Sequence, residues 1–265
     1  MQIRLAVISN AGGTGKTTLS VHLAYELGLR GLKVAIMDLD PQGSLTLFCG
    51  LNPPEPEHTL SAIMRESFNG SWPLTPSWSP HTNNVTVCQG GMTLTQTADE
   101  LVLHKRGAYL LGDCLSDYPL EHDLIIFDCP ATLGPLPLMA LTACTHIIVP
   151  VQLEPKSIQG AAHLLEWYYH HCKQLRLKPQ PEILGFVPNQ YDTKRAVHRQ
   201  LLESLPAHSF SAAPAPLSVE YHKFSPLNQD NGLQLSVTSE GAGHGLDTFR
   251  QKCLSGLFRI RLNLV

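Results

Sequence analysis

The stretch "SNAGGTGKTT" (residues 9–18) follows an apolar run, residues 3–9, and precedes a helical pattern over residues 19–29. Its glycines carry no Cβ atoms, so successive backbone N–H groups are free to surround a phosphate at the start of the next helix. Lys16 is spaced to reach the β- and γ-phosphates, and the Thr17 hydroxyl is placed for Mg²⁺. The predicted phosphate-binding residues are Gly12, Gly13, Thr14, Gly15, Lys16, Thr17 and Thr18.

This loop departs by one residue from each of the two common forms of the motif. The usual form has a glycine where this chain has Asn10. A second form, Lys-Gly-Gly-x-Gly-Lys-Thr, matches everywhere except at its first position, where this chain has Ala11. The loss of that lysine is the main question that the sequence raises.

The composition is that of an ordinary globular α/β protein. The chain has 265 residues, and we expect one domain over residues 1–265. Its net charge of -3 gives no general attraction to nucleic acid or anionic lipid, so such binding needs a local basic patch. The seven cysteines form no C-x-x-C pair, which argues against zinc and disulfides. Without a signal-peptide pattern or a long apolar run, a cytoplasmic protein is expected.

Short β-branched runs alternate with helical patterns along the chain. The predicted strands are Ile3–Ser9, Lys33–Leu39, Val85–Cys88, Asp123–Asp128, His146–Val151 and Ile183–Val187. Near-continuous apolar runs suit strands that are covered on both faces, so we expect a mostly parallel twisted sheet with helices on both faces. The turn-rich segment 69–84 is predicted to form a surface loop, whose Trp72 and Trp78 either cover the domain's own edge or contact a partner.

Two further motifs end predicted strands, where ligands of such sheets bind. "MDLDPQGS" (37–44) provides Asp38, placed to hold an attacking water, and Asp40, which fits an Asp-Pro turn. "LIIFDCPATLG" (124–134) places Asp128 after four apolar residues, as expected of a carboxylate that holds Mg²⁺ through a water.

Taken in order with "VPVQLEPKSIQG" and "VPNQYD", these motifs resemble the ParA/MinD family of deviant P-loop ATPases over nearly the whole chain. The resemblance implies a P-loop NTPase fold, ATP and Mg²⁺ as cofactors, and an ATP-sandwich homodimer whose slow hydrolysis positions a cargo. It assigns catalysis to Lys16 and Asp38, and the metal to Thr17, Asp38 and Asp128. The same resemblance puts Asn189 near adenine, with Pro214 or Pro216 closing the base pocket.

Members of this family usually carry a lysine at the position of Ala11, and it reaches the partner's phosphates. A methyl group cannot neutralise phosphate charge in a water-poor interface. Lys156, in "VQLEPKS", is the candidate replacement because it follows a strand at its carboxyl end; the alternative is a solvated lysine in the first turn of a helix. The pattern is similar to the McdA-type subgroup, which distributes carboxysomes and takes its lysine from later in the chain.

The family also implies a surface to which the dimer adheres. Residues 249–265 carry four cations and no acid, and a second basic group lies near residue 195. The candidate DNA-binding residues are Lys194, Arg195, Arg199, Arg250, Lys252, Arg259 and Arg261. Phosphate contacts of this kind make binding sequence-independent and salt-sensitive. The alternatives are a membrane-surface helix, or a final strand packed on the domain, since "FRIRLNLV" alternates with a period of two.

The favoured hypothesis is a nucleoid-associated positioning ATPase with non-specific DNA and a cargo adaptor as partners. Ala11 inclines the choice of cargo toward carboxysomes rather than plasmids or chromosomes. A metabolic synthetase of similar fold, such as those of the biotin and cobyrinate pathways, and a scaffold without useful hydrolysis are the other hypotheses. His163, His170 and His171 are expected to be surface residues rather than metal ligands.

Overall fold

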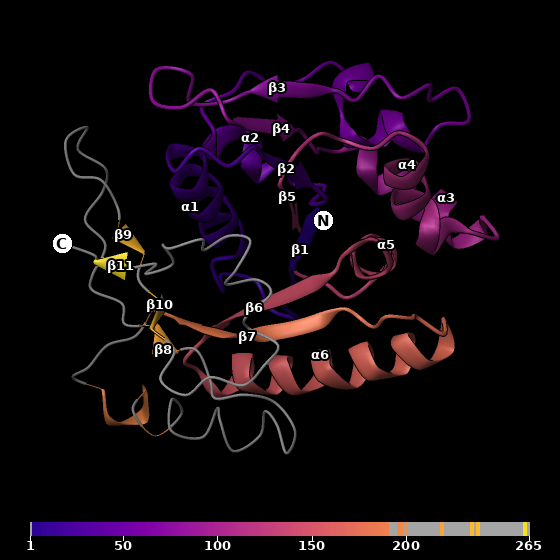
Figure 1. Cartoon of the computed structure of the whole chain (residues 1–265). Coiled ribbons are helices and arrows are strands. Elements are labelled where there is room, and N and C mark those ends of the chain that lie inside the picture. Colours follow the sequence, from indigo (N-terminus) through magenta and orange to yellow (C-terminus); the bar gives the residue numbers. More distant parts are fainter. Residues whose placement is uncertain are drawn as a thin grey trace.

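The computed structural model describes residues 2–190, 195–198 and 200, together with the backbone of four two-residue strands farther along the chain: β8 (Ser218–Val219), β9 (Gln234–Leu235), β10 (Val237–Thr238) and β11 (Leu262–Asn263). Residues 2–190 form a seven-stranded sheet with helices on both faces (Figure 1). The fold class predicted from the apolar runs is therefore confirmed.

The sheet has the order β3-β4-β2-β5-β1-β6-β7. Its strands are β1 (Ile3–Val7), β2 (Val34–Asp38), β3 (Leu74–Pro76), β4 (Val85–Cys88), β5 (Leu124–Asp128), β6 (His146–Gln152) and β7 (Glu182–Asn189). Every pairing is parallel except that of β3 with β4. The six predicted strands are all present, and β3 is an additional antiparallel edge strand inside the segment predicted to be only a loop.

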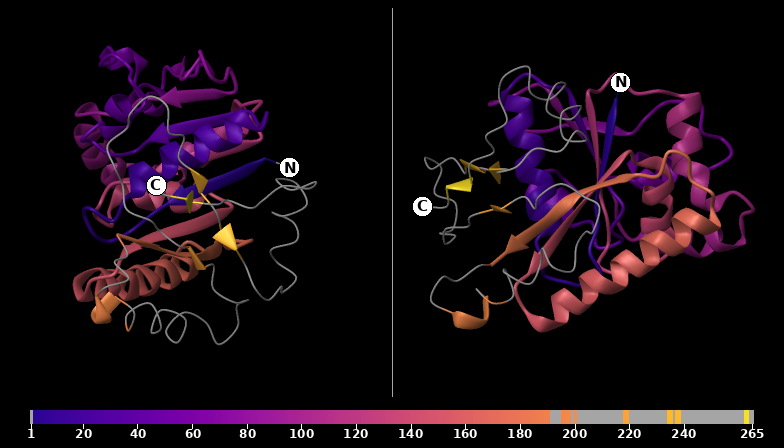
Figure 2. Two further views of the ribbon diagram at one scale, coloured as in Figure 1. Left: turned by 90° about the vertical axis from the view of Figure 1, so that its left-hand side faces the viewer. Right: turned by 60° about the horizontal axis from the view of Figure 1, so that its bottom comes forward.

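Helices cover the two faces of the sheet, as Figure 2 shows from two further directions. One apolar core lies on the side of α1 (Lys16–Leu29) and α2 (Ser44–Phe48). The other lies on the side of α3 (Thr93–Leu103), α4 (Leu110–Asp117), α5 (Pro135–Ala143) and α6 (Pro155–Gln174). Along β1, Leu5 and Val7 enter the first core and Ala6 enters the second. This alternation is why the strands read as continuous apolar runs.

Short 3-10 turns and loops complete the description. These turns are η1 (Pro56–His58), η2 (Leu60–Met64) and η3 (Gly107–Tyr109). Trp72 and Trp78 are half-buried, and each packs against one of the two cores. Trp72 also donates a hydrogen bond of 2.9 Å from Nε1 to the Tyr118 carbonyl oxygen. Both tryptophans therefore cover the edge of their own domain.

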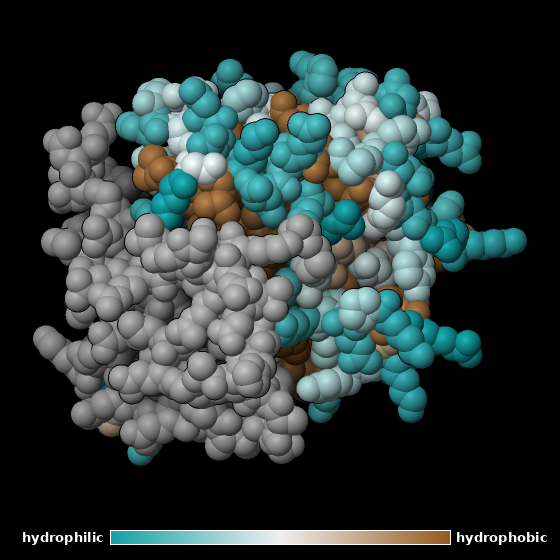
Figure 3. All heavy atoms as spheres, in the orientation of Figure 1, coloured by the Kyte–Doolittle hydropathy of each residue, from teal (hydrophilic) through white to brown (hydrophobic). Residues whose placement is uncertain are grey.

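Where the structure describes the chain, no helix is long and apolar enough to span a membrane. Figure 3 shows hydrophilic side chains projecting from the right-hand side of the molecule, where Figure 1 places the ends of α3 and α6. His163 and His170 are exposed and His171 is half-buried. Among the described residues, no three or more His, Cys, Asp or Glu side chains gather as a metal site would require.

Candidate nucleotide-binding site

The predicted phosphate-binding loop joins β1 to α1 at the carboxyl end of a central strand. Gly13 and Gly15 have φ angles of +74° and +86°, in the left-handed region that glycine enters without strain. Gly15 is also the residue before α1, and a Cβ atom there would overlap Nδ2 of Asn189. The turn thus favours glycine at positions 13 and 15, and the close approach of β7 requires it at position 15.

Lys16 is folded back into the loop rather than extended into solvent. Its side chain is buried, and its ammonium group donates hydrogen bonds to Ser9 Oγ (3.2 Å) and to the Ala11 carbonyl oxygen (3.1 Å). Burial lowers the pKa of Lys16, while the nearby carboxylate of Asp128 raises it. The hydroxyls of Ser9 and Thr14 lie 2.7 Å apart. A cation therefore already lies inside the loop, held by weak neutral partners that an anion can replace.

Asp38 and Asp128 end neighbouring strands and are direct partners in the register of β2 and β5. Both are fully buried. Burial raises the pKa of Asp38 well above its usual value, and the charge of Asp128 raises it further. Asp38 accepts backbone hydrogen bonds from Asp40 N (3.0 Å) and Leu45 N (3.3 Å). Two adjacent buried carboxylates are costly unless a cation lies near them.

The contacts of Asp128 fit a magnesium site. Its Oδ1 accepts a hydrogen bond of 2.9 Å from the Ser20 hydroxyl. Its Oδ2 is buried and has no hydrogen-bond partner within the described part of the chain. Burial raises the pKa of Asp128 to about 6, and the hydroxyls of Thr17 and Ser20 oppose the shift. A few oxygen ligands beside a phosphate site suit Mg²⁺, which usually keeps several waters.

The end of β4 closes the site beside Asp38. A Cβ atom at Gly90 would lie 2.6 Å from the Asp38 carbonyl oxygen, so only glycine permits this approach. Asp40 accepts a hydrogen bond of 3.0 Å from Gln42 N and forms the expected Asp-Pro turn. Sequence reasoning missed Gly90 and Ser20. The Gly90-Gly91 pair directly after a predicted strand was a sequence signal that could have identified Gly90. Ser20 lies inside a helix, and nothing in its sequence surroundings marks it as a site residue.

Helix α6 passes directly beside the loop at Ala11, the position where the second motif form has a lysine. A Cβ atom at Gly160 would lie 2.8 Å from the Asn10 carbonyl oxygen and 3.9 Å from Ala11 Cβ. Lys156 is exposed and lies four residues earlier in α6, which places it on the same helix face one turn toward the N-terminus. The structure therefore brings the face that carries Lys156 next to the loop that lacks a lysine.

The end of β7 lies against the loop on its other side. Asn189 donates a hydrogen bond of 2.9 Å from Nδ2 to the Thr14 carbonyl oxygen, and Gln190 donates one of 3.2 Å from Nε2 to the Gly13 carbonyl oxygen. Asn189 is thus placed beside the phosphate-binding loop. Neither Gln190 nor its neighbour Gln152 was singled out in the sequence, because glutamine carries no signal of its own.

Several predicted site residues lie outside the described residues. These are Pro214 and Pro216 of the predicted base pocket, and Lys194, Arg199, Arg250, Lys252, Arg259 and Arg261 of the predicted DNA surface. Arg195 is described and exposed.

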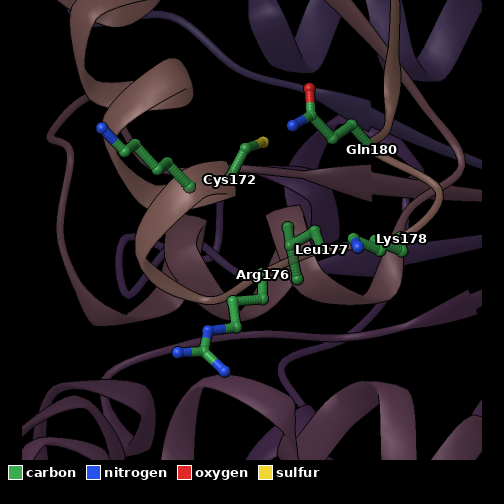
Figure 4. Close-up of a pocket in the computed structure, with 6 residues that line it drawn as sticks. Cys172, Arg176, Leu177, Lys178 and Gln180 are labelled. Atoms are coloured by element: carbon green, nitrogen blue, oxygen red, sulfur yellow. The ribbon is translucent and has the colours of Figure 1, made fainter.

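A basic hollow of about 420 Å³ lies at the C-terminal end of α6 and along the segment that leads into β7 (Figure 4). Its lining residues are Cys172, Lys173, Arg176, Leu177, Lys178 and Gln180. Cations at a helix C-terminus offset the partial negative charge of the last carbonyl groups. That effect accounts for the basic lining without a ligand.

Comparison with known proteins agrees with this geometry. The family model described as "AAA domain" matches residues 2–180. The chain is 30% identical over 213 residues to the chromosome-partitioning ATPase Soj of Thermus thermophilus, an alignment that covers 77% of this chain and 76% of Soj. The chain belongs to the ParA-like P-loop ATPases.

Two solved structures extend the comparison of this ParA-like ATPase. Cobyrinic acid a,c-diamide synthase from Mycobacterium smegmatis, with a bound ATP analogue and magnesium, has a TM-score of 0.72 and 27% identity, and covers 82% of this chain and 87% of the synthase. A Cyanothece McdA variant in complex with ATP has a TM-score of 0.67 and 20% identity, and the match covers 78% of each chain. At that identity the likeness to McdA shows the fold alone.

Proposed function

We propose that this ParA-like ATPase binds ATP with Mg²⁺, forms an ATP-sandwich homodimer, and hydrolyses ATP to distribute a cargo over nucleoid DNA through an adaptor protein. The pairing of Asp38 with Asp128 beside the buried Lys16 carries the proposal. Phosphoryl transfer to water uses a carboxylate pair of this kind, at adjacent strand ends and next to a glycine loop at a helix N-terminus.

Each site residue has a distinct role in this proposal. The backbone N–H groups of the loop and Lys16 hold the phosphates. Thr17 and Asp128 would hold Mg²⁺, since Asp128 Oδ2 has no hydrogen-bond partner among the described residues, and Asp38 would orient the attacking water and assist the metal. Mg²⁺, when bound, neutralises charge on the phosphate oxygens. The magnesium and nucleotide in the related synthase support this assignment.

Lys156 is proposed to supply the cation that Ala11 lacks. Gly160 brings α6 against Asn10 and Ala11, and Lys156 lies one turn away on the same face. An exposed lysine at this position is free to reach phosphates of its own site or those of a second subunit. Without such a cation, two triphosphates facing each other in a water-poor interface repel strongly.

The type of cargo is proposed from the known functions of the related proteins. Chromosome-partitioning proteins recur among them, including ParA of Myxococcus xanthus. Non-specific DNA binding is assigned to the basic residues near Arg195 and to the basic segment 249–265. The alanine at position 11 favours carboxysomes as cargo, and partition of plasmids or chromosomes is the alternative within the same mechanism. A membrane-surface role for the C-terminal segment is the other alternative for adhesion.

A metabolic synthetase is the second candidate function, because the synthase from Mycobacterium smegmatis matches 82% of this chain with 27% identity. Such an enzyme is expected to consume ATP only when its acid substrate is present. A positioning ATPase instead responds to DNA and adaptor. The nucleotide requirement of DNA binding therefore separates the two classes.

The deciding experiment measures binding to non-specific duplex DNA with ATP, with ADP and without nucleotide, at low and moderate salt. Binding that requires ATP and weakens steeply with salt supports the proposal. A charge-neutralised Arg250/Lys252/Arg259/Arg261 variant is expected to lose DNA binding while it keeps nucleotide binding. If the wild-type protein binds nucleotide but binds DNA in none of these states, the DNA-anchored function is wrong, and binding to anionic vesicles is then measured.

A further inference from the structure

The end of β7 makes two side-chain contacts with the main chain of the phosphate-binding loop. Asn189 bonds the Thr14 carbonyl oxygen at 2.9 Å and Gln190 bonds the Gly13 carbonyl oxygen at 3.2 Å. These two carbonyl groups belong to consecutive peptide units in the part of the loop that is richest in glycine. Glycine-rich backbone has many accessible conformations, so contacts of this kind select among them.

The contacts also determine where the loop's N–H groups point. In a planar trans peptide the carbonyl oxygen and the N–H of the next residue face opposite directions. The Gly13 carbonyl shares its peptide with the N–H of Thr14, and the Thr14 carbonyl shares its peptide with the N–H of Gly15. With both carbonyls drawn toward β7, both N–H groups point away from β7. They are then available as donors to a bound anion.

Gln190 is itself held by a second glutamine. Its Oε1 accepts a hydrogen bond of 2.6 Å from Nε2 of Gln152, the last residue of β6. The backbone N–H of Gln190 bonds Asn189 Oδ1 at 2.8 Å, and Gln190 has a φ of +58°. A side-chain-bearing residue rarely adopts this left-handed conformation unless its surroundings impose it. The amides of Gln152 and Gln190 thus form a chain from β6 through the end of β7 to the loop.

We propose that Gln190, braced by Gln152, is a positioning residue that holds the phosphate-binding loop ready for a nucleotide's phosphate groups. The proposal rests on the proposed nucleotide binding and deepens it by adding residues outside the loop that set its affinity. Gln190 does not itself contact the reacting atoms. It acts through the Gly13 carbonyl, and Gln152 acts through Gln190.

The position of these contacts also links the nucleotide to the chain that follows β7. By reciprocity, if the contact of Gln190 with Gly13 strengthens phosphate binding, bound nucleotide strengthens that contact by the same factor. Residues 191–199, which include Lys194, Arg195 and Arg199 of the side chains assigned to DNA, follow Gln190 directly in the sequence. Nucleotide occupancy is thereby connected to the start of a proposed DNA-binding segment.

The test measures the dissociation constant of a fluorescent Mg-ADP analogue for Gln190→Ala, Gln190→Glu and Gln152→Ala. Alanine has a backbone preference at φ +58° similar to that of glutamine, so Gln190→Ala isolates the side chain. Gln190→Glu keeps the shape but removes the donor to the Gly13 carbonyl. We expect the dissociation constant to rise about fivefold for each alanine variant, the effect of one lost hydrogen bond, and more for Gln190→Glu.

A double variant tests whether the two glutamines act as one chain. Gln152→Ala/Gln190→Ala is expected to bind no more weakly than Gln190→Ala alone, because the brace has no role once Gln190 is gone. Gln180→Ala, an exposed glutamine before β7, is the matched control and should bind as the wild-type protein does. The melting temperature without nucleotide should be the same for all variants within about 2 °C.

Three results overturn the proposal: unchanged affinity in both Gln190 variants, fully additive losses in the double variant, or losses that follow the melting temperature. A wild-type protein that binds no nucleotide would overturn the proposed function as well. Because wild-type binding is measured first, failure of the glutamine chain alone is distinguishable from failure of nucleotide binding.

Discussion

Asp38 and Asp128 end adjacent parallel strands as direct register partners, and both side chains are completely shielded from solvent. Burial and mutual repulsion raise the pKa of Asp38, and burial raises that of Asp128 to about 6. In the nucleotide-free protein, ionisation of these two buried carboxyl groups is therefore unfavourable. A cation that enters between loop and strands relieves this penalty, which is the physical basis for a strong preference of this site for a metal-nucleotide complex.

The first prediction concerns pH and Asp128. Its folded pKa, about 6, is above the ordinary value of 3.8, so the folded state holds the proton more tightly. The stabilising contribution is complete below pH 4 and is lost as pH rises through 6. Asp128→Asn should therefore raise the free energy of unfolding at pH 7 by about 1–3 kcal/mol, with a gain that shrinks toward pH 4.5.

Chemical denaturation of the nucleotide-free protein at several pH values measures this difference. Asp117→Asn, at an exposed position on α4, is the matched control and should show little change at either pH. A destabilised Asp128→Asn at pH 7 would contradict the electrostatic argument.

The second prediction separates the two carboxylates of the "DLDPQ" motif. Asp38→Asn should lower the rate of ATP hydrolysis about 100-fold while nucleotide binding persists, because the water loses its orienting group. Asp40→Asn should change the rate less than about threefold, since asparagine keeps the oxygen that accepts the Gln42 N–H and the turn is preserved. Steady-state phosphate release measures both. Equal losses in the two variants would show that the effect is structural.

The third prediction uses two helical glycines. Gly160→Ala places a Cβ atom 2.8 Å from the Asn10 carbonyl oxygen and should destabilise the protein by about 1–3 kcal/mol and weaken nucleotide binding. Gly112→Ala in α4 meets its nearest neighbour at 3.6 Å and should stabilise the protein by up to about 1 kcal/mol through helix propensity. Thermal unfolding of both variants gives the comparison. A stabilised Gly160→Ala would show that α6 is not packed tightly on the loop.

Part of the fold and of the candidate site could be predicted from the sequence alone. The parallel strands, the loop and the ends marked by Asp38 and Asp128 were predictable because each depends on a local pattern of apolar residues and glycines. The strand β3 was not, because three residues within a turn-rich segment leave no periodicity to detect. Its Pro76 also argues against a strand except at a sheet edge, which is where β3 lies.

Contacts between distant elements account for the rest of what the sequence did not reveal. Gln152 and Gln190 matter only because parallel pairing places the ends of β6 and β7 side by side. Gly160 looks like an ordinary small residue in an amphipathic helix, and its need to lack a Cβ atom comes from Asn10, which lies far away in the chain. Such requirements are set by tertiary approach, for which a single sequence carries no spacing rule.

The last prediction concerns the missing lysine. Lys156→Ala should abolish ATP-dependent dimerisation while ADP binding is retained, because the cation is needed only where two triphosphates approach each other. Lys173→Ala, near the other end of the same helix, is the matched control and should dimerise normally. Size-exclusion chromatography with light scattering, using a non-hydrolysable ATP analogue, measures whether each variant is a monomer or a dimer.

Ala11→Lys provides the converse experiment, since it restores the lysine of the second motif form beside Gly160. If Lys156 replaces that lysine, adding Ala11→Lys to Lys156→Ala should recover dimerisation, whereas a structural role for Lys156 would leave the double variant monomeric. A Lys156→Ala protein that dimerises as well as the wild type would show that a different cation, or none, neutralises the phosphates. The double variant thus tests charge at the phosphates independently of the position in the chain from which the charge comes.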